Sequence, residues 1–139
     1  MDAIDTNILV YAFDSAYPEK RRVCKKIVED IFSGKRLGVV TNQILAEFAF
    51  AISMKIETPV NKKDITAIVG SILTSENWKV VNYTGETVLQ ALESEKPLWD
   101  AIIVQTLKMH NIKKIITENV KDFRRTGLTV KNPFDKNLI

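Results

Sequence analysis

The sequence has a single cysteine, Cys24, and a single histidine, His110, among its 139 residues. One cysteine cannot form an internal disulfide, and the two residues together cannot supply the four ligands of a structural zinc site. Cys24 lies in an amphipathic segment, which predicts a half-buried structural thiol. His110 lies at the polar end of an expected helix, where it would act as a cap. The chemistry of the protein must therefore come from other side chains.

Long apolar runs are also missing. No segment approaches the ~20 consecutive apolar residues that cross a bilayer. Charged Asp2 and Asp5 follow the first methionine closely, which is unlike a signal peptide. We therefore expect a soluble cytoplasmic protein without membrane association. The net charge of +3 permits attraction to a polyanion, but so small an excess decides little.

The chain length fits one domain, residues 1–139, and the hydrophobic share of 45% is enough for one core. Strand patterns alternate with helix patterns, without a linker or repeat between them. We expect strands at residues 3–4, 37–40, 78–81, 114–117 and 128–130, helices at 8–13, 18–32, 44–56, 61–75, 84–93 and 97–109, and a short turn or helix at 119–123. This order predicts a three-layer α/β/α fold with a central parallel sheet of four to five strands. Such sheets bind ligands beyond the carboxyl ends of their strands.

Three acidic residues are expected at that edge in apolar surroundings. Asp5 ends the first strand, and Asp100 lies in the first turn of a helix that should begin near the same edge. Glu47 is the only ionisable residue in an apolar helix, so we expect it to be buried on most sides. Two carboxylates ~4 Å apart at an effective dielectric of ~20 repel by ~4 kcal/mol. Because no lysine or arginine lies within these segments, Mg²⁺ or Mn²⁺ is the simplest compensation.

Each acid also has a purely structural interpretation. Asp5 and Asp100 could cap helices, and Glu47 could pair with a distant lysine. The shared position at one sheet edge favours a site over three separate structural roles. A receiver-like or phosphatase-like domain also gathers aspartates at strand ends. It would need an acidic pair at the first strand, and Asp2 lies too early to form one with Asp5.

Four motifs contain these acids and the segment that follows the fourth strand. They are Asp5-Thr6-Asn7-Ile8-Leu9-Val10-Tyr11, Gln43-Ile44-Leu45-Ala46-Glu47-Phe48, Trp99-Asp100-Ala101-Ile102-Ile103 and Thr117-Glu118-Asn119-Val120-Lys121-Asp122-Phe123. Their order and spacing resemble those of PIN domains, especially VapC-type toxin ribonucleases, over nearly the whole chain. The resemblance implies a PIN-like fold and an endoribonuclease that hydrolyses RNA phosphodiester bonds with Mg²⁺ or Mn²⁺. It also implies an antitoxin partner.

The resemblance assigns roles to individual residues. Asp5, Glu47 and Asp100 become the catalytic acids, with Asp5 and Asp100 as direct metal ligands and Glu47 as a ligand or a holder through water. The residues expected to support them by hydrogen bonds are Thr6, Asn7 and Thr117.

The fourth acidic position departs from a common family pattern, which has an aspartate where Asn119 stands. Asn119 can offer a neutral oxygen, or Asp122 can supply the charge from three residues further on. With three acids instead of four, we expect metal to bind weakly. The departure also leaves open a degenerate PIN domain that binds RNA or protein without cutting. A housekeeping RNA-processing nuclease is a further alternative.

RNA and protein partners are predicted more loosely. Basic residues that could contact RNA phosphates are Arg21, Arg22, Lys121, Arg124 and Arg125. Trp99 is expected in the core beside Asp100 rather than as a platform for a base. The resemblance suggests a homodimer, and helices 44–56 and 61–75 have more apolar residues than one sheet face needs. The sequence does not identify the RNA.

Overall fold

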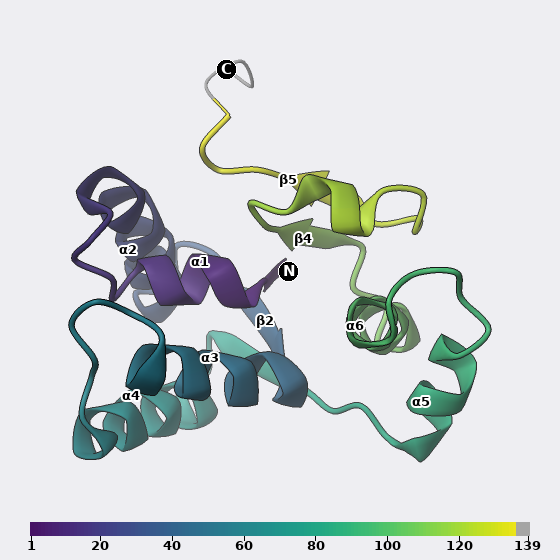
Figure 1. The fold of residues 1–139 in the computed structure, drawn as a ribbon, viewed down its shortest axis with the longest axis horizontal. Coiled ribbons are helices and arrows are strands. Elements are labelled where there is room, and N and C mark those ends of the chain that lie inside the picture. Colours follow the sequence, from purple (N-terminus) through teal and green to yellow (C-terminus); the bar gives the residue numbers. More distant parts are fainter. Residues whose placement is uncertain (136–139) are drawn as a thin grey trace.

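The computed structural model describes residues 1–135 and has a five-stranded parallel sheet at its centre, in the order β3-β2-β1-β4-β5 (Figure 1). The strands are β1 (Asp2–Ile4), β2 (Gly38–Thr41), β3 (Trp78–Val81), β4 (Lys114–Ile116) and β5 (Thr129–Lys131). The helices are α1 (Thr6–Tyr11), α2 (Pro18–Phe32), α3 (Asn42–Met54), α4 (Lys62–Thr74), α5 (Gly85–Ala91) and α6 (Leu98–Met109), and η1 (Val120–Phe123) is a 3₁₀ turn. The predicted α/β/α architecture is confirmed.

Local sequence explains where these elements begin. The strands are short and rich in β-branched residues, and Val39 and Val40 in β2 are fully buried, as expected for a parallel sheet covered on both faces. Thr41 ends β2 and caps α3, because its hydroxyl oxygen accepts a hydrogen bond from the Ile44 N–H at 3.0 Å. Pro18 occupies the first turn of α2, where its missing N–H costs no hydrogen bond.

The strand order determines where a ligand can bind. From β1, the chain adds β2 and β3 on one side of the sheet and β4 and β5 on the other. The order therefore reverses between β1 and β4, and open α/β sheets bind ligands at such a switch point. Ile4 is in register with Ile116, so Asp5 and Thr117 directly follow a paired position. Both residues stand at the switch point.

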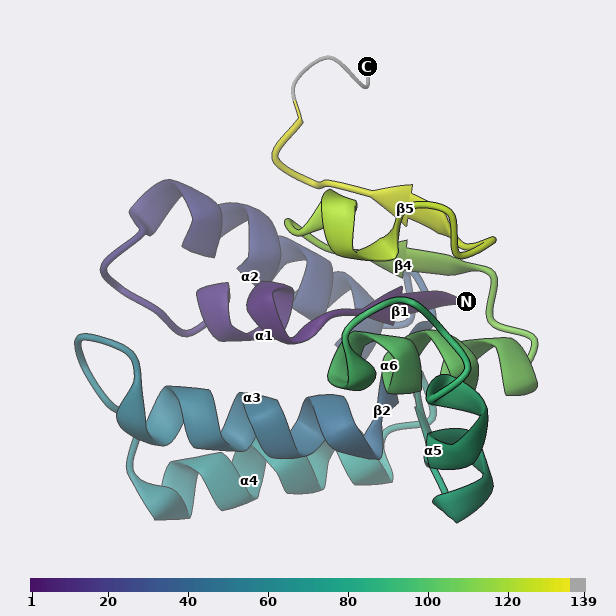
Figure 2. The ribbon, with the colours of Figure 1, turned by 45° about the vertical axis from the view of Figure 1, so that its right-hand side comes forward.

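The helices leave this edge accessible. Helices α1 to α4 lie together on one side in Figure 1, and α5 and α6 lie on the other. In Figure 2, α1 continues directly from the end of β1, with α3 and α6 beginning nearby. α3 packs against both α1 and α4.

Within residues 1–135, no helix has the length and apolarity needed to span a bilayer.

Cys24 and His110 have structural surroundings. Cys24 is fully buried, not half-buried as predicted, because this position of α2 faces the hydrophobic core. Burial raises the pKa of its thiol to about 12, which keeps the thiol protonated and unreactive. His110 is the C-cap of α6, as expected from the sequence, and its Nδ1 lies 2.9 Å from the Thr106 carbonyl oxygen.

Candidate active site at the carboxyl edge of the sheet

A pocket of about 440 Å³ opens at the switch point. Its walls include the carboxylates of Asp5, Glu47, Asp100 and Asp122 and the amide of Asn119, which come from the β1–α1 junction, α3, α6 and the η1 region. Asp14 and Lys55 also line the pocket. The fold thus brings the three predicted acids to one pocket, along with both candidates for the fourth position.

Asp5 is the most buried of these acids, with 6% of its surface exposed. One of its carboxylate oxygens accepts a hydrogen bond from the Thr6 N–H at 2.8 Å. The other accepts from the Thr117 hydroxyl at 2.7 Å and from the Asn7 side-chain amide at 3.2 Å. Thr6 donates through its backbone, and Asn7 and Thr117 donate through their side chains, so these contacts join β1 to β4 across the switch point.

The acids disfavour one another's charge. Burial and, to a smaller extent, the charges of Glu47 and Asp100 raise the pKa of Asp5 to about 6, against the hydrogen bonds from Thr117 and Thr6, which lower it. The pKa of Asp100 is also raised, first by burial and then by the charges of Asp122 and Glu47, while Lys96 opposes this. The pocket is therefore electrostatically unfavourable for negative charge until a cation enters.

Two burial predictions were wrong. Glu47 is exposed, because α1 and α4 cover other sides of α3 and leave Glu47 and Phe50 facing outward. Trp99 is 57% exposed and does not lie in the core. The core contacts of α6 begin two residues later in the chain, at Ala101 and Ile102. Of the three predicted acids, only Asp5 is thus fully enclosed.

The donors fit a hydrated hard cation better than a closed metal site. Within residues 1–135, no three Asp, Glu, His or Cys side chains are grouped so that they could hold a metal ion together. Mg²⁺ needs no such cage, since it keeps several waters and binds through one or two carboxylates plus substrate phosphates. The hydroxyl of Thr6, which lines the pocket, is buried and has no hydrogen-bond partner among the residues that the structure describes. In the described part of the chain, no lysine or arginine forms an ion pair with the four carboxylates.

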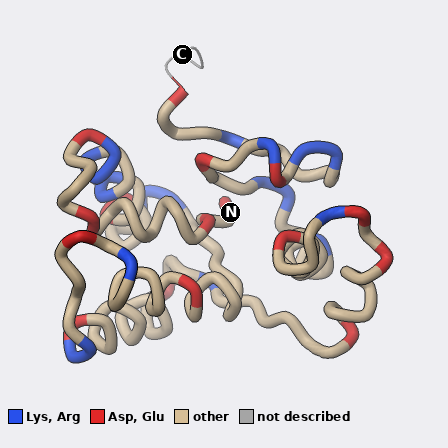
Figure 3. Tube along the Cα trace, in the orientation of Figure 1, with Lys and Arg blue, Asp and Glu red and all other residues tan. Residues whose placement is uncertain are grey.

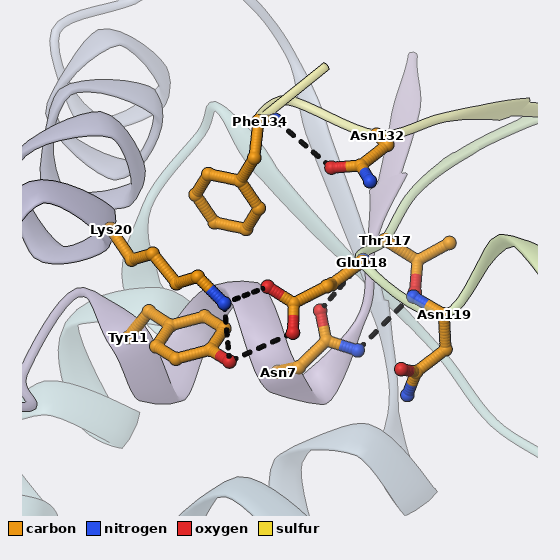
Figure 4. A network of polar contacts seen from close by, with 8 residues as sticks. All are labelled: Asn7, Tyr11, Lys20, Thr117, Glu118, Asn119, Asn132 and Phe134. Carbon is orange, nitrogen blue, oxygen red and sulfur yellow. Dashed lines mark hydrogen bonds and ion pairs between the residues drawn. The ribbon is translucent and has the colours of Figure 1, made fainter. Parts of the chain in front are cut away.

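A polar network beside the pocket was not predicted (Figure 4). Lys20 contacts Glu118 at 2.6 Å, and the Tyr11 hydroxyl donates to the same carboxylate at 2.9 Å. The Glu118 N–H donates to the Asn7 side-chain oxygen at 3.1 Å. The network therefore ties α1, α2 and the segment after β4 to a residue that holds Asp5. A sequence signal existed, because Tyr11 follows Asn7 by one helical turn in the first motif.

Two further polar residues were missed. Asp14 lines the pocket and is buried, and its carboxylate accepts from the Ala16 N–H at 3.0 Å, which stabilises the turn between α1 and α2. Gln43 is 4% exposed, and its amide donates to Glu47 at 2.8 Å and to the Trp99 carbonyl at 3.1 Å. Gln43 stands four residues before Glu47, a spacing that places the two on one helix face.

The predicted RNA-binding residues lie outside the acidic pocket. All are exposed and none lines it: Arg21, Arg22, Lys121, Arg124 and Arg125. Figure 3 shows Lys and Arg along α2 and around η1, on two sides of the sheet edge. Arg125 lines a separate hollow with Lys96 and Lys108, between α6 and the segment before β5. The structure leaves their contribution to RNA binding as a prediction.

The parallel sheet and the acidic pocket at its switch point match a known class. Residues 3–128 match the PIN domain family, and the chain belongs to this family. Comparison with curated proteins gives no match.

Solved structures agree with this fold. One is a toxin-antitoxin complex from Klebsiella pneumoniae, with 20% identity and a TM-score of 0.62 over 97% of this chain and 99% of that chain. FitAcB from Neisseria gonorrhoeae has 15% identity and a TM-score of 0.65 over 96% and 98%. The sarcin-ricin loop cleaving toxin VapC20 of Mycobacterium tuberculosis has 14% identity and a TM-score of 0.56 over 83% and 87%. Identities this low establish the shared fold alone.

Proposed function

We propose that the protein is a Mg²⁺- or Mn²⁺-dependent endoribonuclease and the toxin of a toxin-antitoxin pair. The observation that carries the proposal is Asp5, a buried carboxylate at the switch point of a PIN-domain sheet. Its pKa is raised by burial and by the nearby charges of Glu47 and Asp100. A site that holds ionisable carboxylates together against their repulsion is typical of a functional centre.

Asp5 and Asp100 would bind the ion, with Glu47 binding it directly or through water. Asn119 or Asp122 would occupy the fourth position, and the effect of Asp122 on the pKa of Asp100 supports Asp122. When bound, the ion would acidify a water molecule and neutralise charge on the RNA phosphate. The expected products carry 5′-phosphate and 3′-hydroxyl ends.

The protein's own contribution is to fix the acids before RNA arrives. The Thr6 N–H and the Thr117 hydroxyl hold the two Asp5 oxygens in different directions. The Asn7 amide joins the same group and is itself held by the Glu118 N–H. Such preorganisation lowers the cost of ordering the site during the reaction. The five exposed basic residues described above would contact phosphates along the RNA.

The similar solved structures and the exposed apolar side chains of α3 and α4 support two kinds of protein partner. The Klebsiella and Neisseria structures support an antitoxin partner, since the first is described as a toxin-antitoxin complex. Phe50 and Met54 on α3 and Leu73 on α4 are exposed, which supports association with a second copy. We propose a cytoplasmic homodimer, and light scattering of the purified protein tests its oligomeric state.

Cleavage of end-labelled single-stranded and structured RNAs in Mn²⁺, Mg²⁺ or EDTA tests the central proposal. Wild type should cleave only with metal, and Asp100→Asn should lose cleavage. Glu76→Gln changes an exposed acid that does not line the pocket and should retain cleavage. Circular dichroism checks that each variant folds. Cleavage that persists in EDTA would indicate a contaminant. Metal binding without cleavage of any RNA would favour the non-catalytic alternative. A toxin should arrest the growth of cells that express it, and its antitoxin should restore growth. A housekeeping nuclease should show neither effect.

A further inference from the structure

A second pocket shares a wall with the acidic site. It has a volume of about 760 Å³, within the usual range for small-molecule sites. Glu47 lines both pockets, so a ligand in the second would lie directly beside the carboxylates. Its other walls come from α3, from the first turn of α6 and from the segment before α5, including Gln43, Tyr83 and Trp99.

Aromatic side chains give this pocket its character. Trp99 is 57% exposed and Phe50 is 55% exposed. Trp99 directly precedes Asp100 in the sequence, and Phe50 lies one helical turn after Glu47. Tyr83 is partly buried, and its N–H donates to the Asn42 side-chain oxygen at 2.9 Å, which fixes this wall. An exposed tryptophan beside a phosphodiester-cleaving centre is a natural stacking surface for an unpaired base.

Gln43 supplies a polar group inside the aromatic walls. Its amide nitrogen already donates to the Glu47 carboxylate and the Trp99 carbonyl, which sets the orientation of the side chain. The amide oxygen is buried and has no hydrogen-bond partner within residues 1–135. Buried acceptors without a partner are uncommon and costly, so a ligand N–H that met this oxygen would be favoured.

The surrounding groups select among the bases. The Glu47 carboxylate and the Gln43 amide oxygen present acceptors at the pocket. An edge with an amino group, as in adenine, cytosine or guanine, complements these acceptors. Uracil presents two carbonyl oxygens around its single N–H and would face unfavourable contacts.

We propose that the pocket formed by Gln43, Tyr83 and Trp99 binds the unpaired, amino-bearing base next to the phosphodiester held at the acidic site. This inference rests on the proposed nuclease function and names its substrate class, which is unpaired RNA with adenine, cytosine or guanine at that position. Trp99 would stack on the base, and Gln43 would meet its amino edge.

Tryptophan fluorescence can test this without cleavage. The chain has two tryptophans, and Trp78 is buried, so a base that stacks on exposed Trp99 should quench the exposed signal. The protein is titrated with five-nucleotide oligomers of A, C or U in Ca²⁺, because the acidic site without a cation would repel the RNA phosphates. Affinity is measured in parallel by anisotropy of labelled oligomers. One hydrogen bond of ordinary strength predicts about fivefold tighter binding of A and C than of U.

Variants separate stacking from structure. Trp99→Ala should weaken binding of the A oligomer by about tenfold or more, as expected for the loss of one stacked base. Trp99→Phe should lose the quenching but keep most of the affinity. Leu89→Ala, which changes an exposed apolar residue on α5 that lines neither pocket, should change neither. Equal binding of all three oligomers, or binding unaffected by Trp99→Ala, would overturn the pocket. The pocket would also be overturned if Trp99→Ala dissociated a dimer and left RNA binding intact. That result would show that a second copy of the protein, and not a base, covers this face.

The outcome is independent of the cleavage assay. If RNA is cleaved with metal but Trp99→Ala leaves base preference unchanged, the nuclease stands and the base pocket fails. If amino-bearing oligomers quench Trp99 as expected but no RNA is cleaved, the pocket stands and the catalytic proposal fails.

Discussion

Replacing Asp5 by asparagine should stabilise the metal-free protein at neutral pH, although it removes a central residue of the proposed site. Burial raises the pKa of Asp5 from 3.8 to about 6 in the folded protein. A raised pKa means that the folded state resists ionisation of this carboxyl group. Stability is therefore full below pH 4 and falls as the pH rises through about 6. Asparagine cannot ionise and avoids this loss.

The rise in pKa from 3.8 to about 6 corresponds to ~3 kcal/mol of unfolding free energy at pH 7. Part of this gain is lost, because the new amide nitrogen would face the donating amide of Asn7, and one disrupted hydrogen bond costs ~1 kcal/mol. The Thr6 N–H keeps its acceptor. The Thr117 hydroxyl loses its acceptor, because its oxygen already accepts from the Asn7 amide and the Asn119 N–H and cannot accept a third hydrogen bond, which costs a further ~1 kcal/mol. We therefore expect Asp5→Asn to be more stable than wild type by ~1 kcal/mol at pH 7.

Urea unfolding in EDTA between pH 4 and 8 measures this effect. The advantage of the variant should be smallest at pH 4 and should grow up to about pH 7. Asp30→Asn is a control that should have the opposite effect on stability. The hydrogen bond from Lys26 lowers the pKa of Asp30, so loss of the Asp30 carboxylate should reduce the unfolding free energy at neutral pH. Added Mn²⁺ should stabilise wild type and not Asp5→Asn, since only the former keeps the site. A variant that is less stable than wild type at pH 7, or a difference that does not vary with pH, would refute the reasoning.

Three further outcomes are expected. Thr117→Val removes a hydroxyl that lowers the pKa of Asp5, so cleavage should slow by about tenfold and the acid limb of its pH profile should move to higher pH; an unmoved limb would contradict this. Asp122→Asn should weaken Mn²⁺ binding in calorimetry and Asn119→Asp should strengthen it, whereas unchanged affinities would place the fourth ligand elsewhere. Arg125→Ala should reduce the slope of log affinity for RNA against log salt by about 1, and an unchanged slope would remove it from the RNA path.

Much of the fold followed from the sequence because its signals are local. Every expected strand and helix is present, with ends that differ by a few residues. Buried β-branched runs such as residues 39–41 and caps such as Thr41 are properties of short segments. Alternation of strand and helix then restricts the sheet to parallel topologies. Asp5 could be placed at the sheet edge because it directly follows a strand.

The surface of the site was harder to predict. An apolar helix such as α3 gives no local sign of which face remains uncovered, so Glu47 and Trp99 were expected to be buried and are not. The Lys20–Glu118 contact joins residues 98 positions apart in the chain, and no local pattern indicates such a pairing. The unpartnered oxygen of Gln43 likewise depends on how α3 and α6 meet.

The most direct test of the central claim is the position of a bound Mn²⁺ in crystals of the full chain, measured by its anomalous scattering. We expect one strong peak in the acidic pocket within coordination distance of Asp5 or Asp100, and no peak in Asp5→Asn crystals grown under the same conditions. A peak elsewhere, or one that Asp5→Asn retains unchanged, would contradict a nuclease centre built around Asp5.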